Sequence, residues 1–185
     1  MKKVYVLLAE GFETVEALTP VDICKRSKII DVETVSITEN EYVTSSHGVT
    51  VKANQTWNIS HLEDGDLLVL PGGFPGYTNL AGSKEVGQIV KYYLEHDKYV
   101  AAICGAPVVL AANGLAKGCR ITCHHSVVDK MQDYHYTGEK VTIDGRLITG
   151  IGAGRSFDFA LAFLEVLSDK GTIERLKKGL ELIKQ

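Results

Sequence analysis

Short apolar runs alternate with helix-like segments along this 185-residue chain, and this alternation constrains its fold most strongly. The sequence predicts buried strands at KVYVLL (3–8), DLLVL (66–70) and YVAAI (99–103), each followed by a segment with helical periodicity. Continuously apolar strands are typical of parallel sheets that helices cover on both faces. We therefore expect an α/β fold, a three-layer sandwich around a mostly parallel sheet.

Composition excludes several classes of protein. The net charge of -3 gives no general attraction to nucleic acid or to an anionic membrane. No apolar run approaches the roughly 18–20 residues of a membrane span, and the first run ends before Glu10, too early for a secretory signal. The four cysteines form no C-x-x-C pair, and their spacing indicates neither a disulfide framework nor a zinc ribbon. We therefore expect reduced thiols. We expect one cytoplasmic domain, residues 1–185, with neither nucleic acid nor membrane as a partner.

Cys104 stands between the predicted strand at 99–103 and a helix that starts near Pro107. In parallel sheets, sites form beyond the carboxyl ends of the strands, and a strand-to-helix turn can form a nucleophile elbow. Unpaired N–H groups at the helix start favour a thiolate, so we expect a lowered pKa for Cys104. The alternative is that Cys104 is a small core residue.

Two carboxylates, Glu13 and Glu16, follow the first predicted strand. On a helix, residues three apart share a face. One of them could cap the helix, while the other could be desolvated, stay protonated and donate to a thiolate. The alternative is a pair of solvated carboxylates in the first turn. We expect Thr14 to cap this helix and Pro20 to kink or split it.

Backbone amides and a histidine complete the candidate site. Gly72 and Gly73 in PGGFPG, together with Gly105, could present N–H groups to an oxyanion, or could simply form tight turns. His124, the first of two adjacent histidines, follows the predicted strand RITC and could transfer a proton to or from the thiol. Adjacent histidines suit tetrahedral metal ligation poorly, so we expect no metal and no cofactor.

Five ordered blocks of the chain resemble one family, the ThiJ/PfpI superfamily, in the branch of the parkinsonism-associated protein deglycase and bacterial ThiJ-like proteins. The blocks are LLAEGFETVEALTPVDI, DLLVLPGG, AAICGAPVVLA, ITCHHSVVDKM and SFDFALAFLE. The resemblance implies a flavodoxin-like fold, a homodimer and a reactive Cys104 on a nucleophile elbow. It also implies a protonated Glu16, a nearby His124, and oxyanion amides at Gly73 and Gly105, with Gly72 adjacent.

The resemblance further implies a cofactor-independent cysteine enzyme of the glyoxalase III or deglycase type. Its substrates would be small reactive carbonyls, such as 2-oxoaldehydes, or glycated protein side chains. A redox-sensing stress-response protein or chaperone, with Cys104 oxidised to a sulfinate, is the alternative, and a peptidase is a further one. Two positions depart from the family pattern, because Ile151 and His47 stand where many relatives carry arginine.

Overall fold

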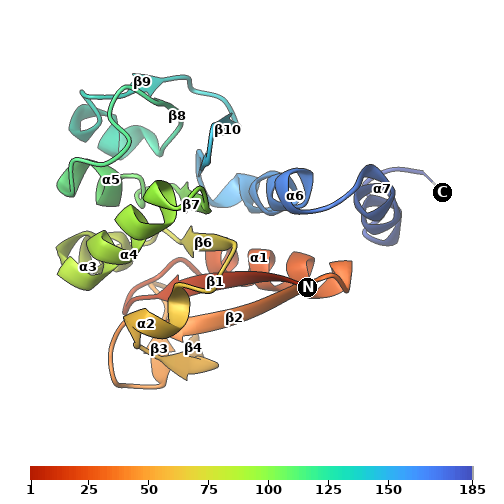
Figure 1. Ribbon diagram of the computed structural model, residues 1–185, viewed down its shortest axis with the longest axis horizontal. Coiled ribbons are helices and arrows are strands. Elements are labelled where there is room, and N and C mark those ends of the chain that lie inside the picture. The colour runs from red at the N-terminus through yellow and green to blue at the C-terminus, as the bar shows by residue number, and fades with distance from the viewer. Residues whose placement is uncertain (185) are drawn as a thin grey trace.

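A seven-stranded sheet forms the centre of the protein (Figure 1). The structure is a computed structural model that describes residues 1–184, apart from the side chains of residues 59 and 60. Across the sheet the strands are β10 (Val141–Asp144), β11 (Leu147–Gly150), β7 (Tyr99–Ile103), β6 (Leu67–Leu70), β1 (Lys2–Leu8), β2 (Ile30–Ser36) and β5 (Gln55–Thr56). Every neighbouring pair is parallel except β10 and β11. The predicted parallel sheet is confirmed.

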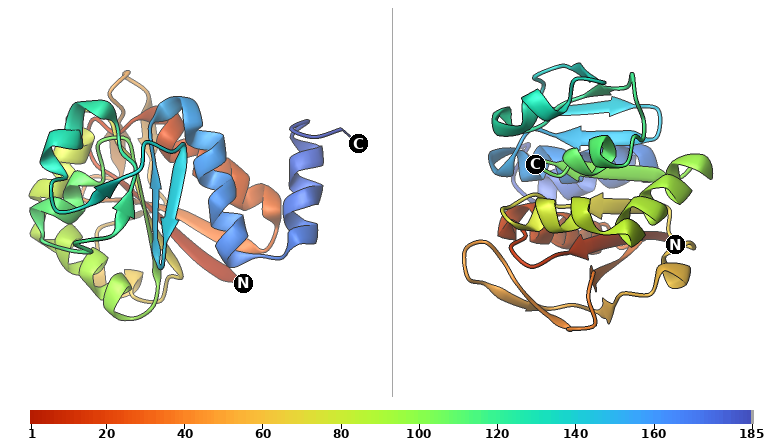
Figure 2. Two further views of the ribbon diagram at one scale, coloured as in Figure 1. Left: turned by 90° about the horizontal axis from the view of Figure 1, so that it is seen from above. Right: turned by 90° about the vertical axis from the view of Figure 1, so that its left-hand side faces the viewer.

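Helices cover both faces of this sheet, as the left view of Figure 2 shows. One layer contains α1 (Thr14–Ser27), α6 (Ser156–Leu167) and α7 (Lys170–Gly179), and the other contains α3 (Gly76–Gly82), α4 (Lys84–Glu95) and α5 (Val108–Ala112). The short helix α2 (Ile59–Leu62) precedes β6. Among the described residues, no helix has the length and apolar character needed to cross a membrane. The predicted three-layer α/β sandwich is confirmed.

Strand β1 separates two hydrophobic cores. Val4, Val6 and Leu8 belong to the core under α1 and α6, while Tyr5 and Leu7 belong to the core under α4 and α5. All five side chains are almost completely buried. Burial of one such aliphatic side chain stabilises the fold by about 1.5–3 kcal/mol. This two-sided burial explains why the strand is apolar at every position rather than at alternate ones.

The smaller elements lie outside the main sheet. They are the hairpin of β3 (Tyr42–Thr44) and β4 (Thr50–Lys52), the pair β8 (Arg120–Ile121) and β9 (His135–Tyr136), and the 3-10 helices η1 (His125–Lys130) and η2 (Ala153–Arg155). The hairpin turn at His47 was predicted. The strand predicted at RITC is wrong in extent, because only its first two residues form β8. Arg120 and Ile121 pair with β9, and the side chains of Asp144 and Thr149 accept the N–H groups of Arg120 and Thr122, each at 2.8 Å.

Helix α1 begins differently from the prediction. Its N-cap is Glu13, whose carboxylate accepts the N–H of Glu16 at 2.9 Å. The Thr14 hydroxyl instead donates to the Ser45 hydroxyl at 2.9 Å, so the predicted Thr14 cap is wrong. The predicted split at Pro20 is also wrong, since α1 continues without a break through its last residue. Pro20 is buried, and packing against the core offsets the hydrogen bond that proline cannot make.

Candidate active site

Cys104 forms a strained turn directly after β7. Its φ of 63° lies in the left-handed region, which costs a residue other than glycine about 1–3 kcal/mol. The backbone around it fixes this conformation, because the N–H of Cys104 donates to Gly150 at 2.9 Å and the N–H of Ala106 donates to Ile103 at 3.0 Å. The chain then enters α5. The predicted strand-to-helix elbow is therefore present, with a partly exposed thiol at its apex.

Two glycines allow other groups to approach this elbow closely. A Cβ atom on Gly72 would lie 2.6 Å from Oε2 of Glu16 and 2.7 Å from Cβ of Cys104. A Cβ atom on Gly105 would lie 2.5 Å from Cδ1 of Tyr77. Real Cβ atoms essentially never approach another heavy atom within 3.0 Å. Glycine at these two positions is thus a steric requirement of the packed site.

Glu16 is a fully buried carboxyl group beside the thiol. Its Oε2 accepts the N–H of Gly72 at 2.8 Å, whereas Oε1 has no hydrogen-bond partner among the described residues. Burial, and next the charge of Glu13, raise the pKa of Glu16 to about 7, although Gly72 and Cys104 act in the opposite direction. Glu16 is therefore protonated in a substantial fraction of molecules at neutral pH.

The pKa of Cys104 departs from the sequence-based expectation. Burial, and then the negative charge of Glu16, raise it to about 12, while the amides of Gly105 and Gly73 lower it. The prediction of a lowered pKa for Cys104 is wrong, because the thiol is buried and faces an ionised carboxylate. A proton on Glu16 removes that charge and turns the carboxyl group into a donor to sulfur. A proton on Glu16 therefore makes the Cys104 thiolate less unfavourable, although burial of the thiol still opposes it.

Backbone amides reach the sulfur from two sides. The backbone N–H groups of Gly73 and Gly105 both donate to the Cys104 sulfur. Gly73 has a φ of 87°, and a Cβ atom there would lie 2.3 Å from the backbone nitrogen of Glu13. Gly72 differs from the prediction, because its N–H donates to Glu16 and is not available to an oxyanion. Two of the three predicted glycine amides therefore point at the reacting position.

His124 approaches the elbow with its backbone rather than with its ring. Its N–H donates to the carbonyl of Cys104 at 2.8 Å. Its Nδ1 accepts the N–H of Ser126 at 3.3 Å and lies 2.8 Å from the Ser126 hydroxyl, so the neutral ring carries its proton on Nε2. Burial, and next His125, lower the pKa of His124. Within residues 1–184, no hydrogen bond joins this ring to the thiol.

The two positions that depart from the family pattern lie near the site in different ways. Nδ1 of His47 is 3.7 Å from Oε1 of Glu13, which places His47 at the border of the carboxylate pair. The His47 side chain is 71% exposed, so its contact with Glu13 contributes little to stability. Ile151 is partly buried, and its N–H donates to Lys140 at 3.1 Å.

Sequence reasoning missed an aromatic pair beside the elbow. Phe74 and Tyr77 follow Gly73, and their ring centroids are 6.2 Å apart. Tyr77 lies on α3, three residues after Phe74 in the preceding turn, and its ring packs on Gly105. The signal was present as two aromatic residues three apart in FPGY, directly after the glycine turn.

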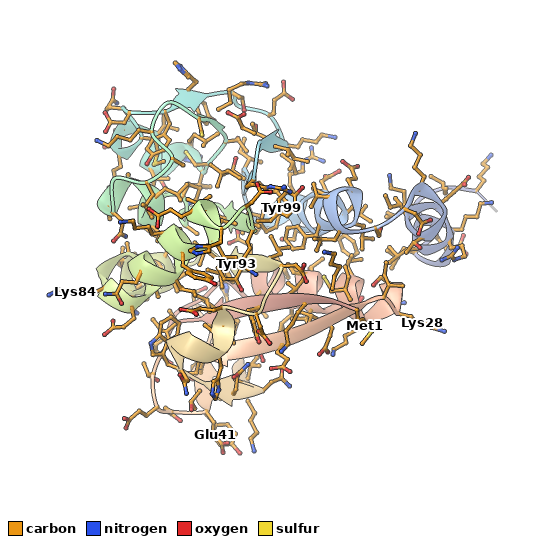
Figure 3. All side chains as sticks on the ribbon, viewed as in Figure 1. Met1, Lys28, Glu41, Lys84, Tyr93 and Tyr99 are labelled. Atoms are coloured by element: carbon orange, nitrogen blue, oxygen red, sulfur yellow. The ribbon has the colours of Figure 1, made fainter. Side chains whose placement is uncertain are left out.

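A cavity of about 520 Å³ lies elsewhere, between the end of α1 and α7. Arg26, Lys28 and Arg175 line it, together with apolar side chains such as Leu176. Figure 3 shows Lys28 at the same end of the molecule as Met1, where β1 begins. Cys104 lies at the opposite, carboxyl-terminal edge of the parallel strands, and none of the predicted site residues lines this cavity.

Comparisons with known proteins place the chain in a family. Residues 2–166 match the model of the DJ-1/PfpI family. The Parkinson disease protein 7 homolog of Danio rerio is 34% identical over 185 residues, 98% of this chain and 97% of the relative. The glutathione-independent glyoxalase DJ-1 of Schizosaccharomyces pombe is 30% identical over 192 residues, 98% of this chain and 100% of the relative.

A solved structure supports the same assignment. A DJ-1 superfamily protein from Salmonella typhimurium, crystallised as a variant with one cysteine replaced by alanine, superposes with a TM-score of 0.91. It is 37% identical to this chain, and the match covers 98% of both chains. Together with the match over residues 2–166, this agreement confirms the resemblance: the chain belongs to the DJ-1/PfpI family.

Proposed function

We propose that this protein is a cofactor-independent cysteine enzyme that converts 2-oxoaldehydes, such as methylglyoxal, to 2-hydroxy acids without glutathione. The observation that carries the proposal is the pairing of Cys104, on its strained elbow, with the buried Glu16, whose Oε1 has no hydrogen-bond partner among the described residues. Relatives named as glutathione-independent glyoxalases support the same chemistry.

The first step is addition of sulfur to the aldehyde. The Glu16 carboxylate takes the proton of the Cys104 thiol, and the resulting thiolate attacks the aldehyde carbon. A carbon–sulfur bond forms and the carbonyl π-electrons move to oxygen. The N–H groups of Gly73 and Gly105 stabilise this oxyanion, and Glu16 then delivers its proton to it. The product is a hemithioacetal, and Glu16 is left as a carboxylate.

The second step moves a proton between two carbons. The Glu16 carboxylate removes the hydrogen of the sulfur-bearing carbon as a proton, and an enediolate forms with its charge on the former ketone oxygen. Glu16 returns this proton to the former ketone carbon, and the hydroxyl proton on the sulfur-bearing carbon passes to the former ketone oxygen. The product is a thioester, in which the former aldehyde carbon is oxidised and the former ketone carbon is reduced. No external oxidant is needed. Water then hydrolyses the thioester, releasing lactate from methylglyoxal and regenerating the thiol. His124 would assist only at the edge of the site, through Nε2–H, because no hydrogen bond joins its ring to the thiol within the described residues.

Glycated protein side chains extend the range of substrates. A methylglyoxal adduct on a cysteine, lysine or arginine side chain releases the aldehyde to the same thiol, and the later steps are unchanged. The partly exposed Cys104 at the edge of the sheet is compatible with an adduct carried on a protein.

Lactate formation from methylglyoxal in the absence of glutathione tests the proposal. We expect turnover by the wild-type protein and none by Cys104→Ser or Glu16→Gln. Replacement of Cys123, a buried cysteine outside the elbow, by serine serves as the matched control and should retain turnover. Absence of turnover by the folded wild-type protein would refute the proposal.

Redox sensing is the second candidate function, favoured by the exposure of Cys104 relative to the buried Cys24 and Cys123. One equivalent of hydrogen peroxide converts the thiolate to a sulfenic acid, and a second gives the sulfinate. The protonated Glu16 would donate to a sulfinate oxygen. Mass spectrometry after mild peroxide treatment should locate two added oxygens on Cys104, with loss of this selectivity in Glu16→Gln. Equal oxidation of Cys119, which is also partly exposed, would argue against a sensor.

A further inference from the structure

An exposed aromatic side chain directly follows Gly73, one of the two glycines whose backbone N–H contacts the candidate nucleophile. Phe74 is 70% exposed, on the loop between β6 and α3. Scattered exposed apolar residues are ordinary on protein surfaces. Phe74 differs because its ring centroid lies 6.2 Å from that of Tyr77, with the planes tilted by 56°. We call these two residues the aromatic rim.

The aromatic rim is joined to the groups that surround the sulfur. Phe74 directly follows Gly73, whose N–H acts on the Cys104 sulfur. Tyr77 packs on Gly105, the other glycine whose N–H acts on that sulfur, so closely that a Cβ atom on Gly105 would lie 2.5 Å from Cδ1 of Tyr77. Phe74 is therefore bonded to one of the two glycines whose amides we assign to the oxyanion, and Tyr77 packs against the other.

The loop that carries the aromatic rim is held in place. The N–H of Tyr77 donates to Gly73 at 2.8 Å. Pro75 packs on Gly11, where a Cβ atom would lie 2.4 Å from its Cδ. The side chain of Asn79 donates to the carbonyl of Glu10 at 2.8 Å. A loop whose backbone is held before binding loses little conformational entropy when a ligand packs on its side chains.

We propose that the aromatic rim of Phe74 and Tyr77 is a subsite for the substituent of the substrate, and that it favours aryl 2-oxoaldehydes such as phenylglyoxal over methylglyoxal. This inference rests on the proposed function. Offset or edge-to-face packing of an aryl ring on Phe74 and Tyr77 stabilises the bound substrate while its aldehyde carbon meets the sulfur. A methyl substituent has no ring to pack on either side chain and offers much less apolar surface.

The ratio of kcat/KM for phenylglyoxal to that for methylglyoxal tests the specificity. We expect this ratio to fall by about three- to ten-fold in Phe74→Ala and in Phe74→Leu, which keeps apolar volume but removes the ring. Because Phe74 is exposed, neither variant should unfold the protein, and circular dichroism checks this. Ile143→Ala, an exposed apolar truncation on β10, is the matched control and should keep the wild-type ratio. An unchanged ratio in both Phe74 variants overturns the inference.

Alkylation of Cys104 separates this inference from the proposed function. Phenacyl bromide and bromoacetone differ by the same phenyl-for-methyl exchange, and each loses bromide as a carbon–sulfur bond forms. Their rates are normalised to those with free cysteine, and Cys104→Ser supplies the background. A phenacyl preference that is lost in Phe74→Ala supports the aromatic rim even if neither aldehyde is turned over, in which case only the proposed function fails. Turnover of both aldehydes with no phenacyl preference overturns the rim alone.

Discussion

Removing the carboxyl group of Glu16 should change how stability depends on pH. The pKa of Glu16 is about 7 in the folded protein against an ordinary value of 4.5. The folded state therefore binds more protons than the unfolded state between these pH values, so the free energy of unfolding falls as pH rises through the window. At about 1.4 kcal/mol for each pKa unit, the loss amounts to roughly 3 kcal/mol. Glu16→Gln has no titrating group there and should not show this loss.

Urea unfolding at pH 4.5, 6 and 8 measures the effect. The difference in unfolding free energy between Glu16→Gln and the wild-type protein should rise by about 3 kcal/mol from pH 4.5 to pH 8. Glu63→Gln removes an exposed carboxylate at the end of α2 and is the matched control for the loss of one carboxyl group. If the unfolding free energies of Glu16→Gln and of the wild-type protein changed in parallel with pH, the raised pKa of the buried Glu16 would be refuted.

Two substitutions test the steric design of the site. Gly72→Ala brings a methyl group against Glu16 and Cys104. We expect it to lower the melting temperature, and to lower kcat/KM by more than about ten-fold. Wild-type values of both quantities would contradict the close packing. Gly105→Ala should destabilise the protein by about 1–3 kcal/mol through its clash with Tyr77, as measured by urea unfolding. Tyr77→Ala should relieve most of that cost, and additive effects in the double variant would show that the two positions do not interact.

The layered architecture could be predicted because it depends on averages over many residues. The apolar runs of β1, β6 and β7 are long enough to identify, and parallel pairing follows from the helices between them. The extent of strand β8 could not be predicted, because the N–H of Thr122, the residue after the strand, donates to the side chain of Thr149 on β11. Such contacts depend on tertiary structure that no local pattern contains.

Four of the predicted site residues lie together in the structure, but the electrostatics of the thiol differ from the prediction. Cys104, Glu16, Gly73 and Gly105 were named from strand ends and from the family resemblance, and the structure brings them together. The helix start suggested a lowered thiol pKa, but burial and the nearby carboxylate outweigh the amides. The sign of that balance requires distances and solvent exposure. The role of Glu13 as the cap also depends on geometry, because both Glu13 and Thr14 have side chains that can accept a backbone N–H.

The central claim is that Cys104 bonds to the aldehyde and that Glu16 carries the following proton transfer. Carbon-13 NMR with methylglyoxal labelled at its aldehyde carbon follows both events. In Glu16→Gln, we expect the signal of a sulfur-bound hemithioacetal that persists without lactate, and in Cys104→Ser neither signal. Lactate formed by Glu16→Gln at the wild-type rate, or by Cys104→Ser at any appreciable rate, would contradict the account.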